Sequence, residues 1–443
     1  MMRMKKKIWS ATVALLAGMT LVACGNQSDS DSQGNTDGKT EITFWAAPNP
    51  TQLAYWEEMA ENFEKENPDI TVTVSQMKES PSSEATIQSA VVSNTAPTIS
   101  ENINRSFGAQ LAESEVIVPL NEIEGFSDIV TSRNMENTVN AWEFANGNQY
   151  VLPAYSNPIL FAWRTDILNE LGYSEPPKTY SELIEVGQKL KEVYPDKVVW
   201  AKGDLSDPTG WMRWFDFFPL YNAASEGNGF IANGELTLDD EAGIELLTMM
   251  SELQENDLLL SSQATDPFEN QVSIMADMGP WTFPNWDEKF PELVFDENYT
   301  VTTPVVPDSM PDAENVATYG DAKGIVIYAQ ATEEEKQAAV EFLQFVYGDV
   351  ENDVKWLETT SLIPARDDAT ENEAFAAYFE ENPEMEVYAE SVQNAIPAME
   401  SANYNELQQI IGQEAWNPIV RGEKTPEQAW NDMKAALEGV LGE

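Results

Sequence analysis

The side chains that most often transfer protons or bind transition metals in enzymes are scarce in this chain. Its 443 residues include no histidine and one cysteine, Cys24. Without an imidazole, Ser-His-Asp and Cys-His catalysis and histidine-ligated zinc are excluded. The 76 acidic residues allow a carboxylate pair for glycoside hydrolysis to be proposed almost anywhere. Composition alone explains such pairs, so they give no positive support to an exported carboxylate-dependent glycan-active enzyme. We keep such an enzyme as the alternative to a protein that binds without catalysis.

Cys24 directly follows a segment with the composition of an export signal. Basic residues at 3 and 5–7 precede an apolar run over residues 8–22, and Leu21-Val22-Ala23 stands directly before the cysteine. A basic head, an apolar core and a small-residue cleavage site are typical of a secretory signal peptide. The apolar run is shorter than the roughly 20 residues of a membrane span. The segment resembles a bacterial lipoprotein signal, which implies removal of residues 1–23 and a diacylglyceryl group on Cys24. A plain signal peptide or an uncleaved membrane helix is the alternative.

The residues after Cys24 have the composition of a linker. Residues 25–39 contain no apolar side chain suited to a core and are rich in Ser, Asp, Asn and Gly, which predicts a flexible connection over residues 24–39. Asp29, Asp31, Gly34 and Glu41 imitate part of a calcium loop, but the acidic closing residue is one position late and no helices flank it. We therefore expect no bound metal and no cofactor.

The charge balance limits the choice of partners. The whole chain has a net charge of −52, and removal of residues 1–23 leaves 20 basic against 76 acidic residues, or −56. A protein with this much negative charge repels phosphate backbones and anionic lipid surfaces, which argues against nucleic-acid binding and peripheral membrane binding. A solvated acidic surface suited to saline or alkaline surroundings explains this balance better than an acidic active site.

Length and periodicity indicate two α/β domains. A chain of 443 residues is too long for one ordinary core. In the first part, β-type runs alternate with helical patterns, which predicts parallel βαβ units. The runs are 42–45, 70–74 and 98–100, and the helical patterns are 52–67, 83–93 and 107–113.

The alternation resumes after the turn-rich residues 146–148 and predicts a second domain. Residues 203–235 are rich in aromatic residues and glycine and lack clear periodicity. The strand-like runs are 150–153, 159–163, 272–275, 299–306 and 324–328. The helical patterns are 180–193, 242–255, a segment from residue 332, and most of the chain from 367 to 441.

Several segments carry a family resemblance when taken together. In chain order they are 42–45, 63–70, 95–97, 176–180, 275–281, 320–327, the glutamate-rich helix to 345, 362–366 and 421–427. This ordered set resembles the extracellular solute-binding proteins of ABC importers, in the sugar-binding group that includes maltose-binding protein. The resemblance implies a binding protein rather than an enzyme.

The resemblance also implies an architecture and a setting. We expect an α/β, two-lobed periplasmic-binding-protein-like fold with a hinge that the chain crosses three times, at 153–159, 299–306 and 362–366. One lobe then comprises 40–152 plus 307–361, and the other 160–298 plus 367–443. The expected ligand is a sugar or oligosaccharide and the expected partners are permease subunits. We further expect a monomer on the outer face of the cell membrane, which it contacts only through the lipid on Cys24.

Candidate ligand residues follow from the chemistry of sugars and the position of strand ends. A sugar site needs aromatic rings for the apolar faces and polar side chains for the hydroxyls, and α/β sheets bind ligands beyond the carboxyl ends of strands. These rules select Trp45 after the first strand and Glu101, Asn102 and Arg105 after the third. Trp281 also matches a family position where an aromatic residue lines the cleft. The remaining candidates lie in the crossings, in the aromatic segment and before the strand at 324: Tyr155, Trp211, Trp214, Asp321 and Arg366.

Overall fold

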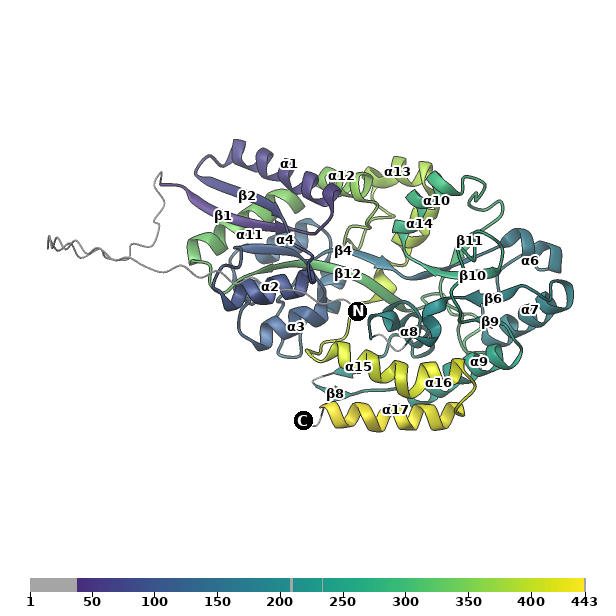
Figure 1. The fold of residues 1–443 in the computed structure, drawn as a ribbon. Coiled ribbons are helices and arrows are strands. Elements are labelled where there is room, and N and C mark those ends of the chain that lie inside the picture. The colour runs from purple at the N-terminus through teal and green to yellow at the C-terminus, as the bar shows by residue number, and fades with distance from the viewer. Residues whose placement is uncertain (1–37, 208–209, 233, 442–443) are drawn as a thin grey trace, which may run out of the picture. The chain divides into compact units, whose positions relative to one another are not determined.

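The structure, a computed structural model, describes residues 38–207, 210–232 and 234–441, with the side chains of 210–212 left out. The predicted signal peptide 1–23, Cys24 and nearly all of the predicted linker 24–39 lie outside the described residues. The described strands form a six-stranded sheet, a five-stranded sheet and a short hairpin (Figure 1).

The six-stranded sheet and the helices packed on it are called the first lobe. Its order is β13-β12-β3-β1-β2, and β4 pairs with β12. β1 is parallel to β2 and β3, whereas β12 is antiparallel to β3 and β4. The strands are β1 (Thr40–Ala46), β2 (Ile70–Gln76), β3 (Ile99–Ile103), β4 (Leu152–Pro158), β12 (Thr318–Ile327) and β13 (Ala395–Ile396).

The first helix, which follows β1, begins at a capping residue and packs its apolar face on the sheet. Asn49 accepts a hydrogen bond from the Thr51 amide and caps the helix, and Trp56 and Phe63 are buried on its apolar face. The rings of Phe44 in β1 and Trp56 in the helix meet edge to face, with centroids 4.7 Å apart. This contact packs the helix against the sheet. The helices of this lobe are α1 (Pro50–Glu66), α2 (Ser83–Val92), α3 (Arg105–Glu113), α4 (Phe126–Ser132), α5 (Glu136–Ala141), α11 (Glu333–Tyr347) and α12 (Val350–Thr360), with a 3-10 turn at Leu120–Glu122.

The five-stranded sheet and its helices are called the second lobe. Its order is β11-β5-β10-β6-β9, in which β10 is parallel to β6 and antiparallel to β5. The strands are β5 (Leu160–Trp163), β6 (Val198–Ala201), β9 (Leu259–Leu260), β10 (Ser273–Met278) and β11 (Thr300–Thr302), and the hairpin is β7 (Ile231–Ala232) with β8 (Glu235–Leu236).

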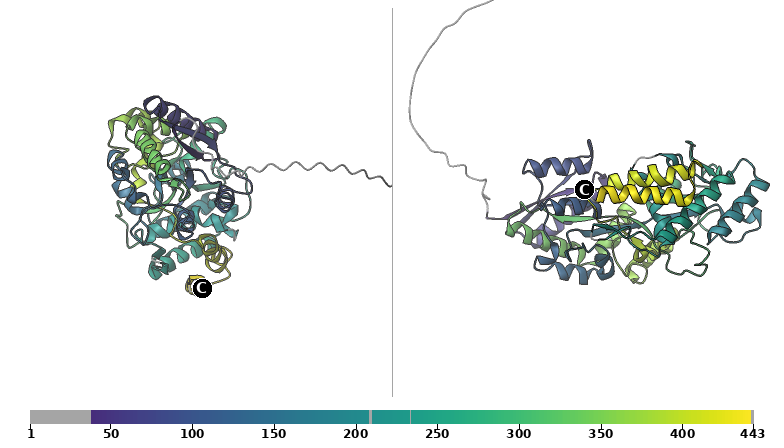
Figure 2. Two further views of the ribbon diagram at one scale, coloured as in Figure 1. Left: turned by 90° about the vertical axis from the view of Figure 1, so that its left-hand side faces the viewer. Right: turned by 90° about the horizontal axis from the view of Figure 1, so that it is seen from below.

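The helices of the second lobe include the C-terminal ones, α15 and α17, which lie side by side in Figures 1 and 2. Thr179 begins α7 with a capping box to Glu182. The helices are α6 (Thr165–Leu171), α7 (Tyr180–Val193), α8 (Phe217–Ala224), α9 (Asp240–Glu255), α10 (Phe283–Lys289), α15 (Tyr404–Ile410), α16 (Asn417–Val420) and α17 (Pro426–Leu441), and a π-helix spans Ile411–Trp416. The short helices α13 (Ala376–Glu381) and α14 (Pro383–Glu390) pack with both Leu160 and Leu357.

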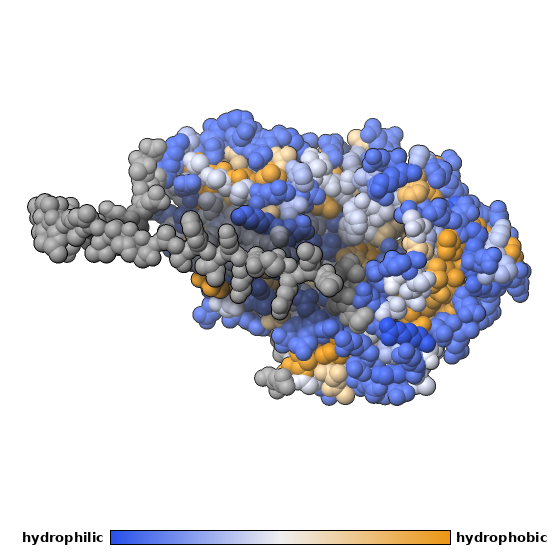
Figure 3. Space-filling model, in the orientation of Figure 1, coloured by the Kyte–Doolittle hydropathy of each residue, from blue (hydrophilic) through white to orange (hydrophobic). Residues whose placement is uncertain are grey.

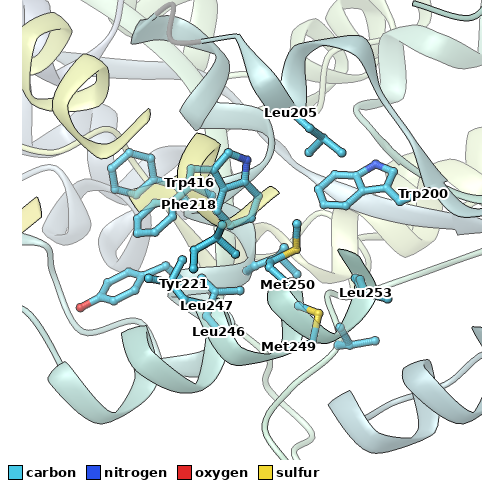
Figure 4. Close-up of a cluster of buried hydrophobic side chains, with 14 of the residues drawn as sticks. Trp200, Leu205, Phe218, Tyr221, Leu246, Leu247, Met249, Met250, Leu253 and Trp416 are labelled. Atoms are coloured by element: carbon cyan, nitrogen blue, oxygen red, sulfur yellow. The ribbon is translucent and has the colours of Figure 1, made fainter. Parts of the chain in front are cut away.

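Each lobe has its own core. In the second lobe, Trp200, Phe218 and Trp416 gather around the methionines of α9, as Figure 4 shows. Trp163 and Trp356 are also buried. Two α/β lobes with separate cores match the predicted fold class.

β4 and β12 run side by side in the six-stranded sheet, on the side of it that faces the second lobe (Figure 1). Only Ile159 separates β4 from β5, and its amide donates to the Tyr319 carbonyl at 2.8 Å. The segment 362–366 joins the same strands, because Ser156 N donates to Ile363 O at 2.9 Å. Residues 299–306 contain β11, which pairs with β5, and Val316 packs with Ala223 and Val306. The segment 299–306, predicted as a crossing, therefore pairs within the second lobe, and the chain reaches the six-stranded sheet at Thr318, where β12 begins.

The face shown in Figure 3 is mainly hydrophilic, with smaller separate apolar patches. Among the described helices, none combines the length and apolar character needed to cross a bilayer.

Candidate functional site

Trp281 is a large aromatic side chain left open to solvent at the carboxyl end of a strand. It lies in the 3-10 helix Pro280–Thr282 directly after β10, and it is 41% exposed. Its ring folds back over Gly279, where an added Cβ would lie 2.2 Å from the nearest ring carbon. Glycine at 279 therefore leaves the space that the indole occupies next to the backbone.

Further rings extend inward from Trp281. Phe215 meets the Trp281 ring edge to face at 6.2 Å and the Tyr319 ring at 6.3 Å. Tyr319 is stacked on Trp214, with centroids 4.9 Å apart and planes at 15°. Trp214 and Tyr319 are buried, so two of the predicted tryptophans, Trp214 and Trp281, belong to one continuous aromatic group. Trp211 lies in the 3-10 helix Gly210–Phe215, but its side chain is outside the described part.

A charged pair lies at the ends of the neighbouring parallel strands of the second lobe. Lys202 directly follows β6, and its Nζ is 2.5 Å from Asp277 Oδ2 in β10. Asp277 Oδ1 accepts a hydrogen bond from Trp200 Nε1 at 3.0 Å. Both side chains are partly exposed, at 15% and 11%, so the pair keeps capacity to bond solute hydroxyls.

Polar side chains also lie on the strands that join the lobes. The pairing of β4 with β12 places Lys323 opposite Tyr155 and Asp321 opposite Asn157. Lys323 Nζ is 3.9 Å from Asp321 Oδ1, and this carboxylate is the main reason why the pKa of Lys323 is raised. Burial is the main cause that raises the pKa of the Tyr155 hydroxyl, so this phenol stays neutral.

Glu101 lies in β3, but its carboxylate faces the interior of the first lobe. It is fully buried and accepts hydrogen bonds from Ala47 N at 2.9 Å, Gln52 Nε2 at 2.6 Å and Trp56 Nε1 at 3.0 Å. Burial raises its pKa to about 7, although these three donors and Lys323 oppose the shift. Its acceptor positions are thus used inside the lobe.

The other first-lobe candidates have mixed surroundings. Trp45 is half-buried in β1 and packs against the cluster that contains Phe107. Asn102 is half-buried with φ +70°, a left-handed conformation that asparagine tolerates. Arg105 begins α3 and donates to Glu143 O at 2.6 Å and Glu400 Oε2 at 2.8 Å.

Arg366 is buried, away from solvent. Its Nη1 is 3.0 Å from Asp353 Oδ2 and its Nε is 2.8 Å from Asp368 Oδ1. Two carboxylates of the fold therefore hold its guanidinium.

Sequence reasoning missed Lys202, Phe215, Asp277, Tyr319 and Lys323. The strand-end rule applies to Lys202, which follows the apolar run 198–201, but that run is absent from the predicted strands. In the described part, no group of three or more acidic, histidine or cysteine side chains is arranged to hold a metal ion. Cavities of about 410 and 530 Å³ flank the loop 175–178, and no candidate residue lines them.

Two α/β lobes joined by paired strands, with aromatic and charged side chains at strand ends, define a two-lobed binding protein. The family described as bacterial extracellular solute-binding protein matches residues 58–387. The chain belongs to this family. Its members are receptors, not enzymes, which confirms the expectation of a binding protein without catalysis.

Relatives show how widely this fold is shared. The crystal structure of the uncharacterized protein lmo0859 from Listeria monocytogenes EGD-e is 71% identical, with a TM-score of 0.90, over 91% of this chain and 100% of that chain. The cyclic alpha-maltosyl-1,6-maltose binding protein from Arthrobacter globiformis has the same fold at 19% identity, with a TM-score of 0.74 over 91% and 99% of the two chains. The sn-glycerol-3-phosphate-binding periplasmic protein UgpB of Escherichia coli K12 is 23% identical over 421 residues, which are 89% of this chain and 91% of that protein.

Proposed function

We propose that this chain is the substrate-binding lipoprotein of an ABC importer, which captures a sugar or an oligosaccharide between its lobes and delivers it to a membrane permease. Family membership supports a solute-binding role. A structural neighbour from Arthrobacter globiformis is named as a binder of a cyclic maltosyl sugar, which supports the choice of carbohydrate.

The exposed indole of Trp281 is the observation that carries the proposal. Trp281 is 41% exposed, and contact of its indole with the apolar face of a sugar ring removes both surfaces from water. Phe215 and Tyr319 stand behind it, so the platform is held in place before the solute arrives. Pre-organisation of this kind lowers the cost of binding.

The hydroxyl groups of the sugar need donors and acceptors near that platform. We assign this role to Lys202 and Asp277 in the second lobe and to Asp321 and Lys323 on the joining strands. The predicted Tyr155 is instead buried in the first-lobe core, where its ring stacks on Trp356. Lys202 and Asp277 lie at the ends of neighbouring strands, where open α/β sheets bind ligands. Trp45, Asn102 and Trp211 are kept as further candidates. Glu101 and Arg366 are not included, because their charged groups are buried and bonded within the fold.

The similarity to UgpB raises sn-glycerol 3-phosphate as a second candidate. A phosphate needs cationic groups that are not already neutralised. Arg105, Lys202 and Lys323 each lie against a carboxylate, at 2.8, 2.5 and 3.9 Å. This pairing favours a neutral polyhydroxyl solute over a phosphate.

Closure of the lobes is the proposed response to the solute. We place the crossings at 153–159, within β12, and at 362–366, which the hydrogen bonds of Ser156 and Ile159 support. Residues 299–317 then move with the second lobe. The predicted lipid on Cys24 would anchor the chain to the outer face of the cell membrane, with residues 25–39 as the linker to the folded body.

A thermal-shift screen tests the proposal. The panel contains monosaccharides, maltotriose, other α- and β-linked oligosaccharides, and sn-glycerol 3-phosphate. A solute that binds only the folded chain raises the melting temperature as its concentration rises. We expect this from at least one saccharide. A rise with sn-glycerol 3-phosphate and with no saccharide would overturn the proposal.

A further inference from the structure

Glu400 joins the two lobes by direct contacts. It lies between β13 and α15, and its Oε2 is 2.8 Å from Arg105 Nη2 at the start of α3. The Ala145 amide, also in the first lobe, donates to both oxygens of the same carboxylate at 3.1 and 3.0 Å. One carboxylate thus accepts from two separate segments of the first lobe.

Neighbouring residues add contacts of the same kind. Ser106 Oγ donates to the Met399 carbonyl, and the Tyr404 hydroxyl donates to Glu84 Oε1 at 2.6 Å. Met399 and Tyr404 are buried in the core of the second lobe. The segment 399–404 is therefore anchored in one lobe while its polar groups reach the other, and Figure 1 shows the chain before α15 next to α3.

The partial burial of Glu400 and Arg105 strengthens the ion pair between them. The side chains of Arg105 and Glu400 are only 13% and 23% exposed, so solvent screens their attraction less than at an open surface. Arg105 is also fixed from its own lobe, by the Glu143 carbonyl and by the Phe144 ring 5.3 Å away. The guanidinium is therefore held in place for the carboxylate.

We propose that Glu400 is a positioning residue that holds the lobes in the arrangement described here, so that retention of a solute depends on it without contact between Glu400 and the solute. The inference rests on the proposed function in one respect, because it takes the described arrangement of the lobes as the one that retains a solute. A hydrogen-bonded charge pair of this type changes a two-state population by about tenfold.

The distance between the lobes in the absence of solute tests this inference. The full chain with Cys24→Ser carries spin labels at Val92→Cys and Val193→Cys. These positions are exposed, on α2 and α7 in different lobes. Pulsed dipolar spectroscopy then compares the parent chain with Glu400→Ala and Glu400→Gln. The matched control is Glu414→Ala, which removes an ion pair to Lys424 inside the second lobe.

In the parent chain we expect a population at the label distance of the present structure. Glu400→Ala should lower the ratio of this population to the populations at other distances about tenfold. Glu400→Gln should lower this ratio less, and Glu414→Ala should leave it unchanged. Equal distributions in the parent and both Glu400 variants, or no such population in the parent, would overturn the inference. No solute is added, so failure to find a bound saccharide counts against the proposed function alone.

Discussion

Arg133 and Asp353 form a buried, two-point ion pair. Arg133 Nη2 is 2.8 Å from Asp353 Oδ1, and its Nε is 3.1 Å from Oδ2. The same guanidinium donates to the carbonyls of Pro153 and Ala154 in β4, at 2.7 Å each. Asp353 also pairs with Arg366, in the segment 362–366. The pair therefore holds two of the segments that join the lobes.

Replacement of Asp353 by alanine should strongly lower the free energy of unfolding. Two guanidinium groups, each less than 5% exposed, would lose their shared carboxylate, and breaking such a pair costs about 3–5 kcal/mol. Denaturant unfolding of wild type and variant measures this loss. Glu414→Ala is the control, with an expected cost below about 1 kcal/mol because its ion pair is partly exposed. A similarly small loss of unfolding free energy for Asp353→Ala would contradict a stabilising role of the buried Arg133–Asp353 pair.

Glu101 should make stability depend on pH. Its folded-state pKa, about 7, is raised above the ordinary 4.5, so its contribution is complete in acid and is lost as the pH rises through 7. The shift corresponds to about 3 kcal/mol. Glu101→Gln removes this titration. The unfolding free energy of wild type minus that of the variant should fall by that amount between pH 4 and pH 8. A difference that is constant or rises with pH would refute the burial argument.

Gly279→Ala should weaken solute binding with little effect on folding. The new Cβ would push the Trp281 ring, whose atoms lie 2.2–2.5 Å from the Cβ position, off its contact with Phe215 and toward solvent, where the displaced ring disturbs no core. The expected loss is about tenfold in affinity for the saccharide found in the screen. In the control Gly439→Ala the new Cβ meets nothing within 4 Å. Unchanged affinity in Gly279→Ala would show that the ring position is unimportant.

Cys24→Ala should release the protein from the membrane. If the thiol carries the lipid, cells fed labelled palmitate will label wild type but not the variant, and the variant will move to the soluble exported fraction. Both proteins should bind the same solutes, because Cys24 precedes the folded unit that begins at Lys39. Label on the variant, or no label on the wild type, would rule out a lipid on Cys24.

Local patterns in the sequence predicted many elements of the fold. The helical pattern at 180–193 matches α7, and that at 52–67 matches α1 within two residues at each end. Alternation of strands and helices predicted two α/β lobes. β12 was predicted only from 324, because its first half, with Thr318, Tyr319 and Asp321, lacks an apolar run. That half is held by pairing with β13 and β4, which are distant in sequence.

The candidate site was harder to predict for a related reason. Trp214 and Trp281 were selected by residue type and position, but Phe215 and Tyr319 connect them only through the fold. The strand-end rule selected Glu101, yet the amide of Ala47 and the side chains of Gln52 and Trp56 turn its carboxylate inward. Which way a strand-end side chain faces depends on such long-range partners.

Calorimetric titration of wild type and Trp281→Ala with the saccharide found in the screen tests the central claim most directly. Wild type should bind one saccharide per chain without consuming it. The variant should bind at least about tenfold more weakly, with an unliganded melting temperature close to that of wild type because the ring is 41% exposed. Equal affinity in both proteins, or turnover of the saccharide, would contradict the account.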